Sequence, residues 1–162
     1  MGLMKQILTI LIFAIPFLVR GQGNKQHEIF VFETNLPDEL QNFYKQKISN
    51  EYALRTDVNP FYLKGNFDGD KKLDFAINIV ERKTNKKGIV IYHTGTNKHF
   101  ILGAGKPFNG QHPGDDFWWM DAWKATVNKS KRTDGILVIK TESSSGLIYW
   151  TGKEYKWQQE GD

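Results

Sequence analysis

From residue 59 onward, apolar and polar side chains alternate with the two-residue period of a β-strand. The clearest case is residues 73–81, where Leu73, Phe75, Ile77 and Ile79 share one parity and are expected to form one buried face. Similar runs recur about every 8–12 residues with polar or glycine turns between them, as in proteins built from β-sheets. The expected strands are 61–64, 73–81, 89–92, 98–102, 118–127, 135–140, 146–150 and 154–157.

The pattern is different before residue 59. Residues 28–34 alternate in parity, which predicts a first strand. Pro37 then opens a segment with acids in its first turn and lysines in its last, an arrangement that complements the helix dipole. We expect one helix over residues 38–48. Its apolar positions fall on one helical face: Leu40, Phe43, Tyr44 and Ile48.

These patterns predict a mainly β fold with one N-terminal helix. Residues 60–102 and 118–158 would each form a meander of three or four strands, which favours antiparallel sheets that stack as a sandwich or curl on each other. Trp118, Trp119 and Trp123 are expected to fill the core between the sheets.

Residues 1–21 have the composition of a cleavable signal peptide. One early lysine precedes the apolar run Ile7–Val19, which at about 13 residues is shorter than the roughly 20 needed to span a bilayer. We expect cleavage after Gly21, with Gln22 the next best position. The mature chain, 22–162, would be a single β-rich domain in the periplasm or outside the cell, with no transmembrane segment.

Composition excludes several kinds of chemistry. The 162 residues include no cysteine, which excludes disulfides, thiolate zinc sites, iron–sulfur clusters and a cysteine nucleophile. The formal charge of +4 falls to +2 in the mature chain, because Lys5 and Arg20 belong to the leader and the leader has no acid. Basic clusters at 83–87 and 129–132 lie at expected turns, so we expect no nucleic-acid partner.

Residues 66–74 carry oxygen side chains at alternate positions. Asn66, Asp68, Asp70 and Asp74 occupy positions 1, 3, 5 and 9 of a loop, and the main-chain carbonyl of Lys72 falls at position 7. Alternate side chains of a tightly wound loop converge on one point, so this spacing can surround a hard cation that takes six to eight oxygens. Three carboxylates so close together repel one another unless they are neutralised. The spacing therefore indicates a divalent cation.

This segment resembles the calcium loop of FG-GAP and VCBS-type repeats, which ends in Leu-Asp-hydrophobic-Ala. The resemblance covers about 20 residues of the chain. Lys71 stands where such loops usually have a glycine, and Ile77 stands where an EF-hand has a glutamate, which argues against an EF-hand. The calcium ligands that the resemblance implies are Asn66, Asp68, Asp70, the Lys72 carbonyl and Asp74.

Two other uses of the loop stay open. It could keep its geometry with water and lysine in place of the ion, or it could take part in catalysis. The rest of the chain is similar to small exported proteins of Bacteroidetes-type bacteria that share its Leu-Ile-Tyr-Trp-x-Gly-Lys-x-Tyr-x-Trp ending.

Residues 103–121 form the longest stretch without periodicity, and long ordered loops often carry function. The histidine of this stretch, with either of the two acids that follow it, could form a general acid–base pair. The preferred interpretation is that these acids cap or turn the chain. A groove lined by a tryptophan and the last aspartate would suit a sugar or a peptide. The candidate side chains are His112, Asp115, Asp116, Trp118 and Asp121.

Aromatic residues alternate across a C-terminal hairpin whose turn is Gly152. The preferred interpretation is that these aromatics only fill the core. In the alternative, one parity lies in the core and the other forms an exposed strip that could contact a partner. Tyr149 and Tyr155 are the candidate contact residues.

The histidines at 27, 93 and 99 are not at metal-ligand spacing. We expect His27, His93 and His99 each to be solvated or to make a single hydrogen bond.

No complete catalytic set is present in the sequence. The leading hypothesis is therefore an exported, non-enzymatic binding or interaction domain with one structural calcium loop and a protein or glycan partner. One alternative is a periplasmic inhibitor or immunity-type protein. The other is a hydrolase that uses the loop at 112–121.

Overall fold

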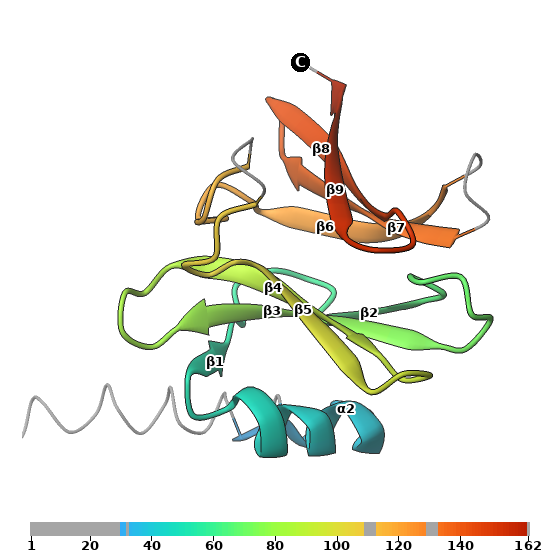
Figure 1. Ribbon diagram of the computed structural model, residues 1–162. Coiled ribbons are helices and arrows are strands. Elements are labelled where there is room, and N and C mark those ends of the chain that lie inside the picture. The colour runs from blue at the N-terminus through green and yellow to red at the C-terminus, as the bar shows by residue number, and fades with distance from the viewer. Residues whose placement is uncertain (1–29, 32, 109–112, 129–132, 162) are drawn as a thin grey trace, which may run out of the picture.

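The computed structural model describes residues 30–31, 33–108, 113–128 and 133–161, and the expected signal peptide lies outside them. The described chain is mainly β, with two antiparallel sheets and a helix that follows Pro37, as predicted (Figure 1). No helix among these residues is long and apolar enough to cross a bilayer. The elements are α2 Asp38–Phe43, η1 Tyr44–Ile48, β1 Tyr52–Leu54, β2 Tyr62–Gly65, β3 Asp74–Glu81, β4 Lys87–His93, β5 Lys98–Gly103, β6 Ala122–Asn128, β7 Thr133–Lys140, β8 Ser144–Trp150 and β9 Tyr155–Gly161.

The predicted helix is present and begins directly after Pro37. Its first turn carries Asp38 and Glu39, and it continues from α2 into the π-helical turn η1, which ends at Ile48. The face predicted to be apolar is buried at all four positions: Leu40, Phe43, Tyr44 and Ile48.

The prediction of a strand at residues 28–34 is wrong. The described residues of that segment, among them Phe30 and Thr34, are helical, and the Thr34 hydroxyl donates to the Val31 carbonyl at 2.9 Å. Phe30 is 64% exposed, so the alternation of side chains in this segment does not correspond to a buried sheet face. The edge of β3 that faces away from β4 is already occupied by β1 and β2.

The first sheet is organised around β3. Its order is β1-β3-β4-β5, and β2 also pairs with β3. β1 pairs with the end of β3 at 79–81 and β2 with its beginning at 74–77, so these two short strands lie end to end along one edge. Sequence reasoning missed β1, because three residues are too few to show a period.

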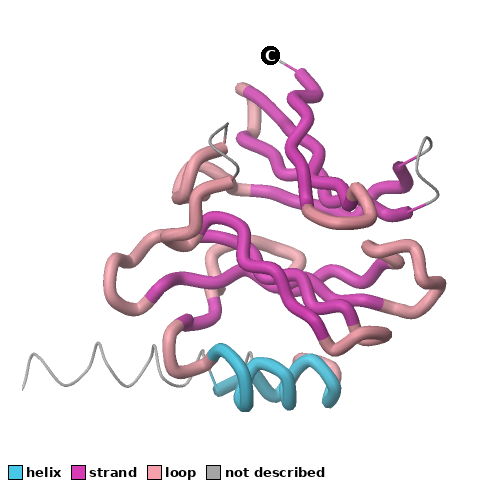
Figure 2. Tube along the Cα trace, viewed as in Figure 1, coloured by secondary structure: helices cyan, strands magenta, loops and turns pink. Residues whose placement is uncertain are grey.

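The molecule has three layers, in which the helix and the second sheet cover opposite faces of the first sheet (Figures 1 and 2). Phe75, Ile77 and Ile79 of β3 pack against the helix, as their shared parity predicted, whereas Leu73 precedes the strand and is 52% exposed. Ala76 faces the other way, into the core between the sheets. β3 is therefore buried on both faces, which the sequence pattern alone did not indicate.

The second sheet is a simple meander in the order β6-β7-β8-β9. The predicted hairpin closes through Gly152, whose φ of +97° is readily accessible only to glycine, and Trp150 pairs with Tyr155. β6 begins at Ala122 rather than at Trp118, because the preceding residues form a turn held by the buried guanidinium of Arg55.

Candidate metal centre

The loop between β2 and β3 is wound by its own side chains. Asn66 Oδ1 accepts hydrogen bonds from the main-chain N–H groups of Gly69 and Lys71, at 2.9 and 3.2 Å. Asp68 Oδ1 accepts from the N–H of Asp70 at 2.9 Å, and Asp70 Oδ1 accepts from the N–H of Lys72 at 2.7 Å. The oxygen side chains of Asn66, Asp68 and Asp70 therefore each close a turn of the loop by accepting a main-chain N–H.

The sharp bend of this loop needs two residues with positive φ. Gly69 has a φ of +87° and Lys71 has a φ of +72°. Lys71 thus adopts the left-handed conformation that glycine favours, at a cost in backbone strain. The loop keeps its turn without the glycine.

Asp74, the first residue of β3, is completely buried. Its Oδ2 accepts from the N–H of Phe67 at 2.9 Å and from that of Asp68 at 3.3 Å, and its Oδ1 accepts from the N–H of Thr94 at 3.1 Å. Burial, and then the negative charge of Asp68, raise the pKa of Asp74 to about 6. These bonds fasten the loop to the start of β3 and to the turn after β4.

His93, the last residue of β4, completes the group and is only 2% exposed. Its Nδ1 lies 3.4 Å from Asp68 Oδ2, and its Nε2 lies 2.5 Å from the hydroxyl of Tyr155 on β9. His93 makes one hydrogen bond, to Tyr155, which agrees with the expectation of a single bond, but it is buried and lies beside Asp68. His99 is exposed, and His27 lies outside the described residues.

The protonation of this histidine follows from its surroundings. Burial lowers the pKa of His93, so the imidazole is neutral near pH 7, and burial raises the pKa of Tyr155, which keeps its proton. The Tyr155 hydroxyl can donate to Nε2 or accept from it, according to the tautomer of the neutral imidazole. In either tautomer this bond holds the ring of His93 beside Asp68.

Asp68, Asp74 and His93 each place one ligand atom within 4.8 Å of the others. Two of the predicted ligands, Asp68 and Asp74, are therefore brought together. Asp70 lies outside this compact group: it is exposed, and its side chain packs against Gly95. His93 could not be recognised from the sequence, since it follows Asp74 by 19 residues and joins the group only through the pairing of β3 with β4.

The loop also contacts the second sheet. The N–H of Asn66 donates to Asp134 Oδ2 at 2.8 Å, and the N–H of Asp134 donates to the Asn66 carbonyl at 2.9 Å. With the bond between His93 and Tyr155, the loop is tied to β7 and β9 as well as to its own sheet. A cation here would lie at the junction of the two sheets.

In the second candidate region, residues 112–121, the acidic side chains that the structure describes bond to neighbouring segments of the chain. Asp115 pairs with the Lys86 ammonium group, and Asp116 Oδ1 accepts from the N–H of Lys87 at 2.9 Å. Asp121 accepts from Lys140 Nζ and from the N–H of Thr141, both at 2.9 Å, and these bonds lower its pKa to about 2. The preferred interpretation, in which the acids hold the chain, agrees with this geometry, and His112 lies outside the described residues.

The candidate contact aromatics separate into buried and exposed positions. Trp123 is 3% exposed and lies in the core, whereas Trp118, also expected there, is 69% exposed. Tyr149 is half-buried. Tyr155 is 4% exposed, so the expectation that it forms part of an exposed strip is corrected: its ring packs between the sheets because its hydroxyl reaches His93.

Comparison with protein-family models, with curated proteins and with solved structures finds no match to this chain.

Proposed function

We propose that this protein is an exported, non-enzymatic binding domain whose loop at residues 66–74 holds one calcium ion. The observation that carries the proposal is the close approach of the Asp68 and Asp74 carboxylates. Within the described residues, neither forms an ion pair with lysine or arginine, and the adjacent His93 is neutral at pH 7. Two such carboxylates repel each other until a cation lies between them.

The donor set of the loop fits a hard cation. The loop spacing offers Asn66 and the Lys72 carbonyl as further oxygens beside Asp68 and Asp74, and Asp70 would join them by turning away from Gly95. Oxygen is the ligand that calcium prefers. His93 adds a nitrogen nearby; in this proposal the Tyr155 hydroxyl donates to Nε2, so that Nδ1 carries a proton rather than a lone pair on the side of Asp68. It therefore acts in this proposal as a positioning residue for Asp68 and not as a ligand.

The role of the ion would be structural. The loop contacts β7 of the second sheet, and His93 beside it bonds to Tyr155 of β9, so a bound cation would stabilise the junction of the two layers. A domain with no disulfide gains from such a tie outside the cell, where calcium is abundant. The engagement of Asp115, Asp116 and Asp121 with structural partners supports a non-enzymatic role.

The test is a calcium titration of the purified protein after dialysis against EDTA. Calorimetry should give one site with a Kd in the range of about 0.1–1 mM, as in extracellular calcium modules. At 10 mM calcium chloride the free energy of unfolding should rise by about 2 kcal/mol. Asp68→Asn should abolish both effects, whereas Glu51→Gln, which removes an exposed carboxylate elsewhere, should preserve them.

Two results would overturn the proposal. The first is an absence of both heat and stabilisation at 10 mM calcium. The second is stabilisation by zinc, and not by calcium, that disappears in His93→Gln, because this would make His93 a nitrogen ligand of a softer metal ion.

A further inference from the structure

The last strand of the first sheet, β5, has an open edge. The N–H of Ala104 donates to the Lys87 carbonyl at 2.8 Å, and this bond shows which residues of β5 occupy the hydrogen-bonded positions of the pair with β4. In an antiparallel pair, hydrogen-bonded positions alternate, so Leu102 and Phe100 bond to β4 while the main-chain groups of Ile101 and His99 point away from it. Among the described residues, no hydrogen bond reaches these outward groups of Ile101 and His99.

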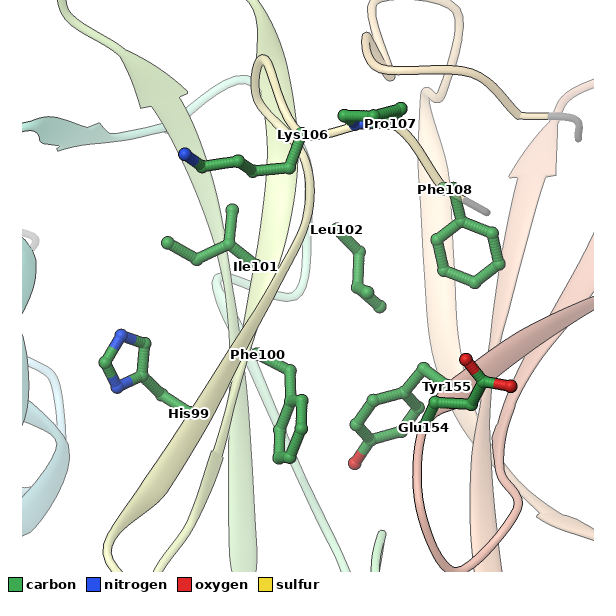
Figure 3. Close-up of a pocket in the computed structure, with 9 residues that line it drawn as sticks. All are labelled: His99, Phe100, Ile101, Leu102, Lys106, Pro107, Phe108, Glu154 and Tyr155. Carbon is green, nitrogen blue, oxygen red and sulfur yellow. The ribbon is translucent and has the colours of Figure 1, made fainter. Parts of the chain in front are cut away.

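A groove of about 420 Å³ runs along this edge (Figure 3). On one side of β5 it is apolar, where Phe100 and Leu102 point toward Phe108 and Tyr155 at the margin of the core between the sheets. On the other side are His99 and Ile101, with Lys106 above them. One face of β5 therefore presents apolar side chains to the groove, and the other face presents an imidazole and a nearby ammonium group.

The accessible charge along this edge is positive. Lys98 and Lys106 are both exposed at its two ends, and within the described residues neither forms an ion pair. Glu154, on the far wall, is held 3.6 Å from the ammonium group of Lys156. Lysines on an edge strand oppose pairing with a second basic strand, so the edge is suited to an acidic one.

We propose that β5 pairs with an extended peptide in which apolar and acidic residues alternate. A strand added antiparallel to β5 would bond to the outward groups of Ile101 and His99. Its residue opposite Phe100 would point into the apolar side of the groove, and its residue opposite Ile101 would point to the side where Lys106 lies. This proposal names the partner of the binding domain proposed above and rests on that function.

The test uses a fluorescein-labelled, eight-residue peptide of alternating valine and glutamate, with a valine–lysine peptide as its counterpart. Fluorescence anisotropy should show binding of the acidic peptide and about tenfold weaker binding of the basic one. In amide hydrogen exchange, the acidic peptide should protect the N–H groups of His99 and Ile101. The amides of β9, the edge strand of the other sheet, should not change.

Two variants separate the backbone pairing from the charge. His99→Pro removes one outward N–H and leaves the bonds to β4 in place, so it should weaken binding about tenfold with little change in melting temperature. Lys106→Glu should reverse the preference between the acidic and basic peptides. Lys124→Glu, an exposed lysine on β6, is the matched control and should bind as the wild type does.

The proposal is overturned if the acidic peptide does not bind, if it binds no better than the basic one, or if His99 and Ile101 exchange equally fast at saturation. Protection of both amides in the absence of peptide, with a dimer in sedimentation, would assign the edge to a second copy of the chain instead. A calcium titration of the same samples distinguishes the two proposals. A calcium response without peptide binding overturns only the peptide proposal.

Discussion

Asp74 connects local chemistry to stability at the scale of a single residue. Its carboxylate is buried, and its pKa of about 6 in the folded protein exceeds its ordinary value of 3.8. An acid with a raised folded pKa stabilises the fold below its unfolded pKa, and that contribution is lost as the pH rises through the folded pKa. In the absence of a cation, Asp74 therefore makes the protein less stable at pH 7 than at pH 4.

The variant Asp74→Asn should remove this part of the pH dependence. In EDTA, the wild type should lose up to about 3 kcal/mol between pH 4 and pH 7 through this group, and the variant should lose correspondingly less. Urea unfolding at a series of pH values measures the difference, with Asp38→Asn, an exposed aspartate in α2, as the control. An unchanged slope in Asp74→Asn would contradict the assignment. Saturating calcium should also flatten the wild-type curve, because it favours the ionised carboxylate.

The turn before β6 is held at the scale of elements by Arg55, which follows β1 and is 4% exposed. Its Nη1 donates to the Phe117 carbonyl at 3.0 Å and its Nη2 to the Met120 carbonyl at 2.7 Å, while its Nε donates to Asp57 at 2.6 Å. One guanidinium thus connects the edge of the first sheet to the segment that leads into the second.

Arg55→Ala should destabilise the protein by about 2–4 kcal/mol, since it removes the guanidinium that bonds to two main-chain carbonyls and leaves that of Met120 without this donor. Arg55→Lys should recover only part of the loss, because an ammonium group cannot reproduce the planar geometry of the guanidinium. Thermal melting measures both variants, and Arg82→Ala, at an exposed hydrogen bond, is the control. Equal stability of Arg55→Ala and the wild type would contradict this account.

The extent to which the sequence predicts this fold depends on the length of each element. β3 and the helix could be predicted because eight or more residues repeat one period. β1 has only three residues, which are too few to show a period. Residues 28–34 alternate in polarity as a strand does, although their described residues are helical. Asp68 and Asp74 could be paired from their spacing within one loop. His93 and Tyr155 could not, because strand pairing and sheet stacking bring them to the loop from distant positions.

The two sheets form one cooperative unit at the scale of the whole molecule. A single core joins Ala76 and Ile89 of the first sheet to Trp123, Ile136 and Ile148 of the second. Two layers that share one core cannot expose it separately, so we expect them to unfold together.

Urea unfolding should therefore give one transition, with the same midpoint for tryptophan fluorescence and for far-ultraviolet circular dichroism. Four of the five tryptophans lie in or against the core between the sheets, so fluorescence reports on the sheet interface, and circular dichroism reports on both sheets. Separate midpoints for the two signals would show that the sheets unfold independently.

The end-to-end placement of β1 and β2 has a consequence for self-assembly. Strands of three and four residues offer an incoming chain only a short, interrupted template on that side of the first sheet. β5, with six residues, offers a longer and continuous one on the other. Pairing between the β5 strands of two copies occupies the one long edge of each first sheet. Association through β5 therefore ends in a closed pair rather than a growing fibre.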